Sequence, residues 1–356
     1  MEKTAHSFPL FLYCLSLLAV LAPASCKAQS SQQLLVLPEL RYLRQEPDAS
    51  GENDSDYRAS LDLLYALDIN QYRFFAEFIA TDEKSELARL HLGYKTRAGT
   101  TFWLGRFQLN QGYWNKTFHF RNYIQSSIQP PGIAAYERED GALPVHFSGL
   151  DIRHQWALSP DATLQLEAGF GAGTKLEGRR LDGFDLLDPD GGRKPSTSVR
   201  LSYLPGQDTD TEFGIFYVDN RMPMRRLQFI QNKQRVSGGY ANTRFDALRL
   251  YGALYWIDNE LKTSAGRQSD HFYSAWLQGD YHLYENWTPY LRIEHSNGDS
   301  DDPYASLFPA FVRDRKLAGL RWDFLENQAF KIEYASTDFL REDSSQWAFQ
   351  WSMIFP

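Results

Sequence analysis

The last ten residues of the chain alternate between bulky apolar side chains and small or polar ones. Residues 346–355 read QWAFQWSMIF. Every second position of this segment carries a large apolar side chain: Trp347, Phe349, Trp351, Met353 and Phe355. Because successive side chains of a β-strand point to opposite faces, a strand here has one strongly apolar face. Two environments fit such a strand, namely the lipid-facing wall of a transmembrane β-barrel and the half-buried sheet of a soluble β-sandwich.

The N-terminal segment has the pattern of a secretory signal peptide. Lys3 precedes an apolar run over residues 8–21, which is too short for a membrane-spanning helix, and small residues follow this run. We predict a signal peptide over residues 1–28, cleaved after Ala28 or alternatively after Ala24. Both cysteines of the chain lie in this segment: Cys14 and Cys26. The mature chain then has no disulfide, which fits export through an oxidising compartment to a fold held by other means.

The composition favours a membrane barrel over a soluble domain. The mean hydropathy is −0.48, yet aromatic residues make up 15% of the chain. A barrel displays such residues to lipid and at its two rims, whereas a soluble domain has to bury them. The formal net charge is −8 and no basic tract stands out, so we predict no nucleic-acid partner.

A period of two runs along almost the whole mature chain. The alternation is cleanest in residues 57–69, 86–95, 163–170 and 273–283. It is weaker in residues 34–44, 72–81, 101–109, 145–157, 196–204, 211–219, 244–257, 288–297, 313–324 and 329–338. With residues 346–355 these segments predict fifteen strands. A barrel with an even number of strands needs one more, which we place at residues 222–236.

The connections alternate between short and long. Short ones are expected near residues 69–71, 97–100, 158–161, 205–210, 285–286 and 325–328, and long polar ones at 45–56, 110–144, 173–195, 258–270 and 298–312. Short periplasmic turns and long extracellular loops are typical of outer-membrane barrels. Aromatic residues in the apolar phase flank the short turns and predict an interfacial girdle: Tyr94, Trp103, Trp156, Tyr203, Tyr281, Trp287, Phe324 and Phe330. We therefore predict an all-β fold, a transmembrane antiparallel barrel of sixteen strands over residues 29–356, in the outer membrane.

The polar phase of the strands predicts the lining of the lumen, since a charged group facing lipid costs ~2–4 kcal/mol near the bilayer midplane. The predicted pore-lining residues are Arg73, Glu77, Arg89, Arg106, Arg153, Arg249, Arg292, Glu294 and Arg321. Further charged residues of this phase include Arg58, Asp62, Asp151, Glu167, Arg200, Asp280, Arg315, Lys331 and Glu333. Two interpretations remain: a water-filled channel, or a lattice of salt bridges that closes the lumen. The interior of a sixteen-stranded barrel is too wide for side chains alone to fill, which favours the channel.

Residues 104–154 carry a family resemblance. A strand ending in GRF, a polar NQGYWN turn and a long loop together resemble bacterial outer-membrane porins of the phosphate-selective family and their relatives. The resemblance implies a sixteen-stranded barrel, usually a homotrimer, whose third long loop folds inward. It assigns residues 110–144 to this constriction loop, with charged candidates Arg121, Glu137, Arg138, Glu139 and Asp140. The YERED sequence in the loop departs from the family's ladder of basic residues, so the resemblance supports a porin without supporting phosphate as its solute.

An enzymatic interpretation rests on one short motif. EHSNG at residues 294–298 is similar to the His-Ser-Asn signature of the outer-membrane phospholipase. In such a site a base has to reach the hydroxyl of the nucleophile. His295 and Ser296 are adjacent, so a regular strand points them to opposite faces. We therefore predict that the protein is not an enzyme and has no catalytic residue.

No motif for a cofactor or a metal is complete. The histidines are scattered without metal-ligand spacing. Asp188 with Asp190, and residues 299–302, offer carboxylates to Ca²⁺, but neither set completes a calcium-loop pattern. Solvated acidic loop tips explain both segments, with divalent bridging to lipopolysaccharide as the alternative. We predict no cofactor and no metal.

Taken together, the sequence predicts an outer-membrane porin for passive diffusion of small hydrophilic solutes, with anions favoured by the slight basic excess of the inward phase. Its expected partners are the lipid bilayer, lipopolysaccharide, the solutes or ions themselves and two further copies in a trimer. Arg106 lies on the strand that enters the predicted constriction loop, so reversing its charge is expected to shift selectivity toward cations. The competing interpretation is a non-conducting barrel that serves as an adhesin, a receptor or an anchor.

Overall fold

The computed structural model describes residues 30–46, 55–82, 85–118, 122–137, 141–186, 189–206 and 210–356. The predicted signal peptide at residues 1–28 lies outside these residues and stays a prediction. Among the described residues the helical segments are short, and none has the length and apolarity needed to cross a membrane.

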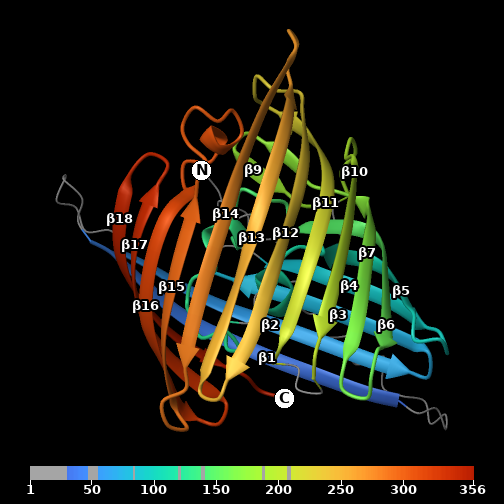
Figure 1. Ribbon diagram of the computed structural model, residues 1–356, viewed down its shortest axis with the longest axis vertical. Coiled ribbons are helices and arrows are strands. Elements are labelled where there is room, and N and C mark those ends of the chain that lie inside the picture. The colour runs from blue at the N-terminus through green and yellow to red at the C-terminus, as the bar shows by residue number, and fades with distance from the viewer. Residues whose placement is uncertain are drawn as a thin grey trace, which may run out of the picture.

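Sixteen strands pair in chain order into one closed antiparallel barrel (Figure 1). The first half of the wall consists of β1 (Ser30–Gln45), β2 (Ser55–Ile69), β3 (Tyr72–Thr81), β4 (Ser85–Lys95), β5 (Thr101–Gln108), β6 (His146–Ala157), β7 (Thr163–Ala172) and β10 (Pro195–Leu204). The second half consists of β11 (Glu212–Arg225), β12 (Gln231–Phe245), β13 (Leu248–Lys262), β14 (Arg267–Tyr281), β15 (Trp287–Ser296), β16 (Val312–Leu325), β17 (Gln328–Phe339) and β18 (Asp343–Met353). Strand β1 pairs with both β2 and β18, which closes the ring. The predicted fold class is confirmed.

The remaining elements lie in the connections. They are α2 (Trp114–Phe118), η1 (Gly132–Ala134), the hairpin β8 (Lys175–Glu177) with β9 (Arg180–Asp182), and η2 (Ala305–Leu307). Strand β8 also pairs in parallel with the end of β11, through Met224 and Leu176. This pairing fastens the β7–β10 connection to the rim of the barrel.

The closing strand shows how alternation places side chains. Trp347 and Trp351 of β18 each expose 38% of their surface on the outside, while Ala348 and Gln350 between them are buried inside. The strand ends earlier than predicted, at Met353, but Phe355 still bridges to Val36 by two backbone hydrogen bonds of 2.9 Å. The apolar face predicted for residues 346–355 is therefore the outer face of the barrel.

The sixteenth strand was predicted in the wrong place. Residues 222–236 include the turn between β11 and β12, and residues 244–257 include the turn between β12 and β13. The second turn has only Asp246 and Ala247, and Asp246 takes the left-handed conformation with φ 54° without a glycine to signal it. The alternation is also weak here, because the inner face of β13 is itself apolar and aromatic, while β12 carries Asn232 and Gln234 inside and Lys233 and Arg235 in the opposite phase.

Long connections are fewer than predicted. Four of them stand at one end of the barrel, at residues 46–54, 109–145, 173–194 and 297–311. The predicted long loop at 258–270 is wrong, since β13 and β14 continue to a short turn at 263–266. All connections at the opposite end are short, as the alternation of loop lengths predicts.

The outward aromatic residues form the predicted rim with one exception. Six of the eight predicted girdle residues face outward and expose 37–48% of their surface: Tyr94, Trp156, Tyr203, Tyr281, Trp287 and Phe330. Phe324 packs against the exposed Trp322, with ring centroids 5.4 Å apart. Trp103 instead points into the barrel, where Gly93 leaves room for its ring and Arg153 stacks 5.5 Å from its centroid. Its assignment to the girdle was wrong.

The hydrophobic core of the molecule sits inside the barrel. The inner faces of β11–β14 supply Phe216, Val236, Tyr240, Tyr251, Tyr255, Ile257, Phe272 and Trp276, all buried. Residues from α2 and from the segment around η2 pack on this wall, so that chain from the long connections covers it. In Figure 1 the teal connection between β5 and β6 lies between the strands of the front wall and those of the rear wall. The connections thus fill space that sixteen strands alone leave empty.

Candidate functional site: a gap between the barrel wall and an inner segment

The connection between β5 and β6, residues 109–145, crosses the inside of the barrel, and we call it the inner segment. Its backbone carbonyls are held by inward cations of β15–β17. Arg292 donates to the carbonyls of Gln129 at 2.9 Å and Pro130 at 3.1 Å. Arg315 Nη1 also donates to Pro130, at 3.2 Å. The cationic side chains of the barrel wall thus supply the hydrogen-bond donors that these buried carbonyls need.

Two further cations fix the first part of the inner segment. Arg321 Nη1 donates to the carbonyl of Gln125 at 3.1 Å and to that of Tyr123, and Lys331 donates to that of Asn122. Each of these wall residues was assigned to the inward phase by alternation alone. They bind the backbone of the inner segment instead of facing an open lumen.

Carboxylates of the same wall accept hydrogen bonds from amides of the inner segment. Glu333 accepts from the amides of Ile128 at 2.7 Å and Gln129 at 3.2 Å. Glu294 accepts from the amide of Gly132 at 2.6 Å. Donors and acceptors on β15–β17 therefore bind both polar groups of the same stretch of backbone, which defines one position for residues 122–132.

The opposite side of the inner segment is held by aromatic packing. Trp114 of α2 has no exposed surface. Its ring centroid lies 5.6 Å from that of Trp276 and 6.3 Å from that of Tyr251. Arg249, another predicted pore-lining residue, donates to the hydroxyl of Tyr113 at 2.9 Å. The β13–β15 side of the lumen is consequently closed by packed side chains.

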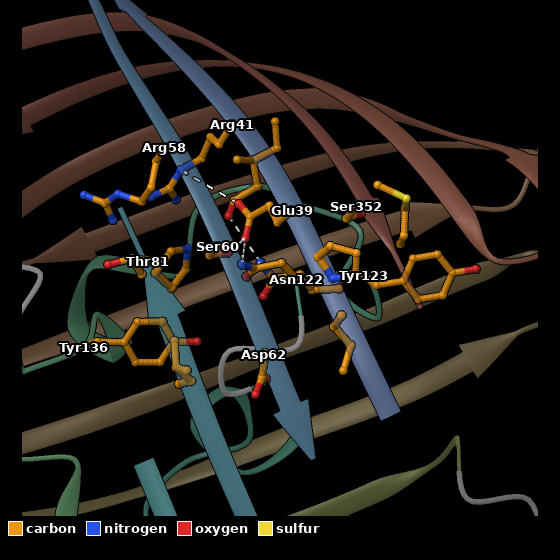
Figure 2. Close-up of a pocket in the computed structure, with 17 residues that line it drawn as sticks. Glu39, Arg41, Arg58, Ser60, Asp62, Thr81, Asn122, Tyr123, Tyr136 and Ser352 are labelled. Atoms are coloured by element: carbon orange, nitrogen blue, oxygen red, sulfur yellow. Dashed lines mark hydrogen bonds and ion pairs between the residues drawn. The ribbon is translucent and has the colours of Figure 1, made fainter. Parts of the chain in front are cut away.

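A narrow gap remains between the inner segment and the wall formed by β1, β2, β3 and β18. It encloses a cavity of about 60 Å³. Its polar and charged lining includes Glu39, Arg41, Arg58, Ser60, Asp62, Thr81, Asn122, Tyr123, Tyr136 and Ser352 (Figure 2). A cavity of this size holds a few water molecules at most, given about 30 Å³ per water in the liquid.

The charges of the gap are mixed and closely spaced. Glu39 accepts hydrogen bonds from Ser60 at 3.0 Å and from Asn122 across the gap, and its ion pair with Arg41 spans 4.0 Å. Arg41 and Arg58 stand directly opposite each other in the β1–β2 register (Figure 2). Like charges opposite each other in an antiparallel pair repel, and the nearby Glu39 carboxylate offsets part of that repulsion.

None of the nine predicted pore-lining residues lines this gap. Arg89 forms two hydrogen bonds with Glu77 inside the wall, and Arg73 pairs with Asp68 at 3.7 Å. Arg106 is 2% exposed and donates to the carbonyl of Leu87 at 2.8 Å. Arg58 and Asp62 belong to the predicted inward phase, but Glu39 and Arg41 were missed, because the inner face of β1 mixes these charges with Leu35 and Leu37.

Of the five charged residues predicted for the constriction loop, one lies in the described part of the chain. Arg121, Arg138, Glu139 and Asp140 fall outside the described residues. Glu137 is buried away from the gap, where it accepts from the amides of Val145 at 2.7 Å and His146 at 3.1 Å and from the hydroxyl of Thr174 at 2.6 Å. Burial alone would raise the pKa of Glu137, but these donors and the His146 ring lower it to about 2. Glu137 fastens the end of the inner segment to β6.

Glu137→Gln is expected to lower the thermal stability of the barrel at pH 6 and to have less effect at pH 3. A carboxylate whose pKa is lowered on folding stabilises the protein above its unfolded pKa, near 4.5. This stabilisation, about 3 kcal/mol for a fall to about 2, is lost as the pH falls toward the folded pKa. Melting curves of both proteins at the two pH values test this expectation. An equal difference in melting temperature at both would contradict it.

The structure also places the His-Ser motif and the acidic segments that the sequence offered as an enzymatic site and as calcium sites. Ser296 points inward and donates to Ser274 at 2.7 Å, whereas His295 is exposed on the outside and contacts Asp314 at 2.8 Å. The two side chains therefore do not form a nucleophile–base pair. Asp190 is engaged by Lys175 and Arg193, and Asp188 falls outside the described residues. Within the described part of the chain, no cluster of metal-ligating side chains is found.

Comparisons with known proteins agree on the fold. No model of a known family and no curated sequence matches the chain. Among solved structures, the outer-membrane channel DcaP of Acinetobacter baumannii has a TM-score of 0.60 at 10% identity over 94% of this chain and 100% of that chain. An anion-selective porin from Comamonas acidovorans has a TM-score of 0.62 at 10% identity over 92% and 100%. Salmonella typhi OmpF, in complex with daunomycin, has a TM-score of 0.57 at 12% identity over 91% and 97%.

These likenesses and the closed ring define the class of fold. The chain is a sixteen-stranded antiparallel β-barrel built like the outer-membrane porins. The sequence resemblance to the phosphate-selective family predicted the strand number and a long connection after β5, and both agree with the structure.

Proposed function

We propose that the protein is an outer-membrane channel for small hydrophilic solutes, and that the gap between the inner segment and β1–β3 is its selective point. One observation carries this proposal. The polar cavity is lined by charged side chains of both signs on one wall and by the inner segment on the other. A constriction of this kind selects by size and by electrostatic field.

We further propose that small anions pass more readily than cations. The guanidinium groups of Arg41 and Arg58 are adjacent, while Glu39 is already engaged by three hydrogen-bond donors, from Ser60, Asn122 and Gln350. The likeness to the anion-selective porin from Comamonas acidovorans is consistent with this direction. Phosphate is not singled out by any feature of the gap.

Export by the signal peptide and assembly into a homotrimer are part of the same proposal. The likeness to OmpT of Vibrio cholerae, described in a trimer form, supports the second point, with a TM-score of 0.56 at 9% identity over 92% of this chain and 99% of that chain. An apolar hollow of about 470 Å³ on the outer face of β2–β6, lined by Leu67, Leu92, Leu104 and Leu150, offers a surface for lipid or a neighbouring copy. Chemical cross-linking of the folded protein in detergent distinguishes a trimer from a monomer.

Arg41→Glu is expected to move the reversal potential toward cation selectivity. The measurement is single-channel current from the refolded mature chain in a planar bilayer with a salt gradient across it. Arg226→Glu is the matched control, because Arg226 lies in the β11–β12 turn with 78% of its side chain exposed, away from the gap. Arg106→Glu should shift the potential less than Arg41→Glu, since Arg106 is buried in the wall.

The packed interior also favours a second candidate, a barrel that does not conduct and acts through its external connections. The aromatic core and the fastened inner segment close most of the lumen among the described residues. Discrete current steps from the folded protein would exclude this candidate. A folded barrel without any steps would favour it, and would direct attention to the connections at 173–194 and 297–311.

A further inference from the structure

A second interior cavity lies beside the inner segment on the β3–β6 side of the barrel, and we call it the side cavity. Its volume is about 240 Å³, several times that of the gap. Phe75, His91, Trp103 and Arg153 contribute from the wall, and Lys116 of α2 contributes from the inner segment. Trp103 and Arg153 lie near the ends of β5 and β6, next to short turns, so the cavity is on the periplasmic side of α2 in the proposed orientation.

Three residues that line the side cavity, His91, Trp103 and Gln108, have side-chain nitrogens without partners. Trp103 Nε1, Gln108 Nε2 and His91 Nε2 are buried and have no hydrogen-bond partner among the described residues. His91 is 6% exposed and Gln108 is 7% exposed, so bulk solvent does not satisfy them. Buried polar groups are nearly always paired, and an unpaired one costs about 1–3 kcal/mol. Two of these three groups are N–H donors, which require an acceptor.

The charges beside the cavity do not balance. In the described chain, three cations share two carboxylates: Lys116, Arg153 and Arg200 surround Glu167, and Arg153 also binds Asp151 at 2.6 Å. The side chain of Asn110 donates to Asp151 at 2.9 Å, so this carboxylate is already shared. Arg89 is neutralised separately by Glu77. Among the described residues, this cluster therefore has one more cation than carboxylates.

The lysine contacts Glu167 from the inner segment, but its charged form is disfavoured. Burial, together with the neighbouring Arg153 guanidinium, lowers the pKa of Lys116 to about 7, although Glu167 acts in the opposite direction. A bound anion next to Lys116 would stabilise its charged form.

Apart from Arg89, which pairs with Glu77, the remaining lining of the cavity is aromatic. The ring of His91 stacks on that of Phe107 at 4.2 Å, and its centroid lies 5.3 Å from that of Phe75 and 5.8 Å from that of Trp103. Flat apolar groups pack well against such rings, and ring pairs contribute beyond the area they bury. The cavity thus has three features: N–H donors without an acceptor, one more cation than carboxylates among the described residues beside it, and an aromatic wall.

We propose that the side cavity binds a small organic anion that carries one carboxylate on a flat apolar body. The carboxylate would accept from Lys116 and from the nitrogens of Trp103 and Gln108, whose buried side chains would turn toward it. The apolar body would pack on Phe75 and His91. This inference rests on the proposed channel function, and it names a solute class that the channel retains on the periplasmic side of α2. A carboxylate supplies both the missing negative charge and the missing acceptors.

Calorimetric titration of the purified folded protein in detergent tests the proposal with benzoate as the probe. Acetate and inorganic phosphate supply the charge without the aromatic body, and benzamide supplies the body without the charge. Benzoate is expected to bind at least ten times more tightly than any of the three. Equal binding of benzoate and benzamide would show that the site does not require a negative charge. Equal binding of benzoate and acetate or phosphate would show that it does not require an aromatic body.

Two variants locate the site. Lys116→Gln is expected to weaken benzoate binding by about 10- to 100-fold, because a hydrogen bond to a charged group is lost. Trp103→Phe keeps an aromatic ring but removes one donor, and is expected to weaken it by about 2- to 10-fold. Arg244→Gln is the matched control, since it removes an inward cation near the short turns of the opposite wall, where Arg244 pairs with Asp210 at 2.6 Å.

Electrophoretic mobility with and without heating shows whether each variant is folded. A loss of benzoate affinity in a folded variant is then not caused by unfolding. Unchanged benzoate affinity in both folded variants would place the anion elsewhere. The channel function is measured separately in the bilayer. A protein that conducts but does not bind benzoate overturns this inference alone, whereas one that binds benzoate but shows no current overturns the channel and leaves the side cavity in place.

Discussion

Replacing Arg292 by methionine is expected to free the inner segment and to raise single-channel conductance several-fold. The Arg292 side chain is fully buried, and it binds the carbonyls of Gln129 and Pro130, the Ser127 hydroxyl and Glu294. Methionine keeps much of the apolar volume but supplies no donor. Breaking a buried ion pair by removing one partner costs about 3–5 kcal/mol, because the other charge stays buried. Planar-bilayer recording and a melting curve measure the two effects.

Arg267→Met provides the matched control for this change. Arg267 pairs with Glu260 at 2.6 Å, but 70% of its side chain is exposed at the end of β14. Exposed ion pairs contribute about 0–1 kcal/mol, so neither stability nor conductance should change much. If the Arg292 variant conducted like the parent while remaining folded, the inner segment would be held by its aromatic side instead, through Trp114.

Substituting alanine for Gly105 is expected to prevent the barrel from reaching its heat-resistant folded form. Gly105 has φ +151°, a conformation that side chains other than glycine rarely adopt. A Cβ atom there would lie 1.8 Å from the carbonyl oxygen of Leu90 on the neighbouring strand. Both strands would have to move, so we expect a loss of more than about 4 kcal/mol, in the range of the most damaging single substitutions. Urea-dependent refolding, followed by the heat-dependent shift in electrophoretic mobility, measures it.

Gly239→Ala tests whether this effect is specific to position 105. Gly239 also lies within a strand, but a Cβ there would meet its nearest atom, the carbonyl oxygen of Gly214, at 3.4 Å. It has no positive φ, so the substitution should leave refolding nearly unchanged. Similar losses in both variants would mean that any side chain in place of a strand glycine is harmful, and that the close approach at Leu90 is not the cause.

Alternation predicted the wall of the barrel well. Lipid outside favours apolar side chains and the polar interior favours polar ones, so neighbouring residues of a strand differ in type. The outward Trp347 and Trp351 and the inward Gln350 follow directly from it. Where the inner face is itself apolar, as around Tyr251 and Tyr255, that contrast disappears. The position of β13 was missed for this reason, and that of β12 because Lys233 and Arg235 make its outward phase polar as well.

The selective point was harder to predict, because alternation tells which way a side chain points and not what it meets. Arg292 and Arg321 do point inward, but they meet the backbone of a segment more than 160 residues away in the chain. Arg41 and Glu39 line the gap only because the inner segment packs against β13–β17, on the other side of the barrel. The path of a long connection depends on many weak contacts at once, and no local pattern encodes it.

The hydrogen bonds that hold the inner segment also constrain the order in which the molecule can be completed. Residues 122–132 are synthesised early, yet their partners on β15–β17 follow 162–209 residues later. Contacts between such distant residues have to overcome the entropy of a long closed loop before they contribute any stability. Residues 122–132 can therefore take their final position only after the last strands have been added, and a chain cut before β15 would leave them without their polar partners on β15–β17.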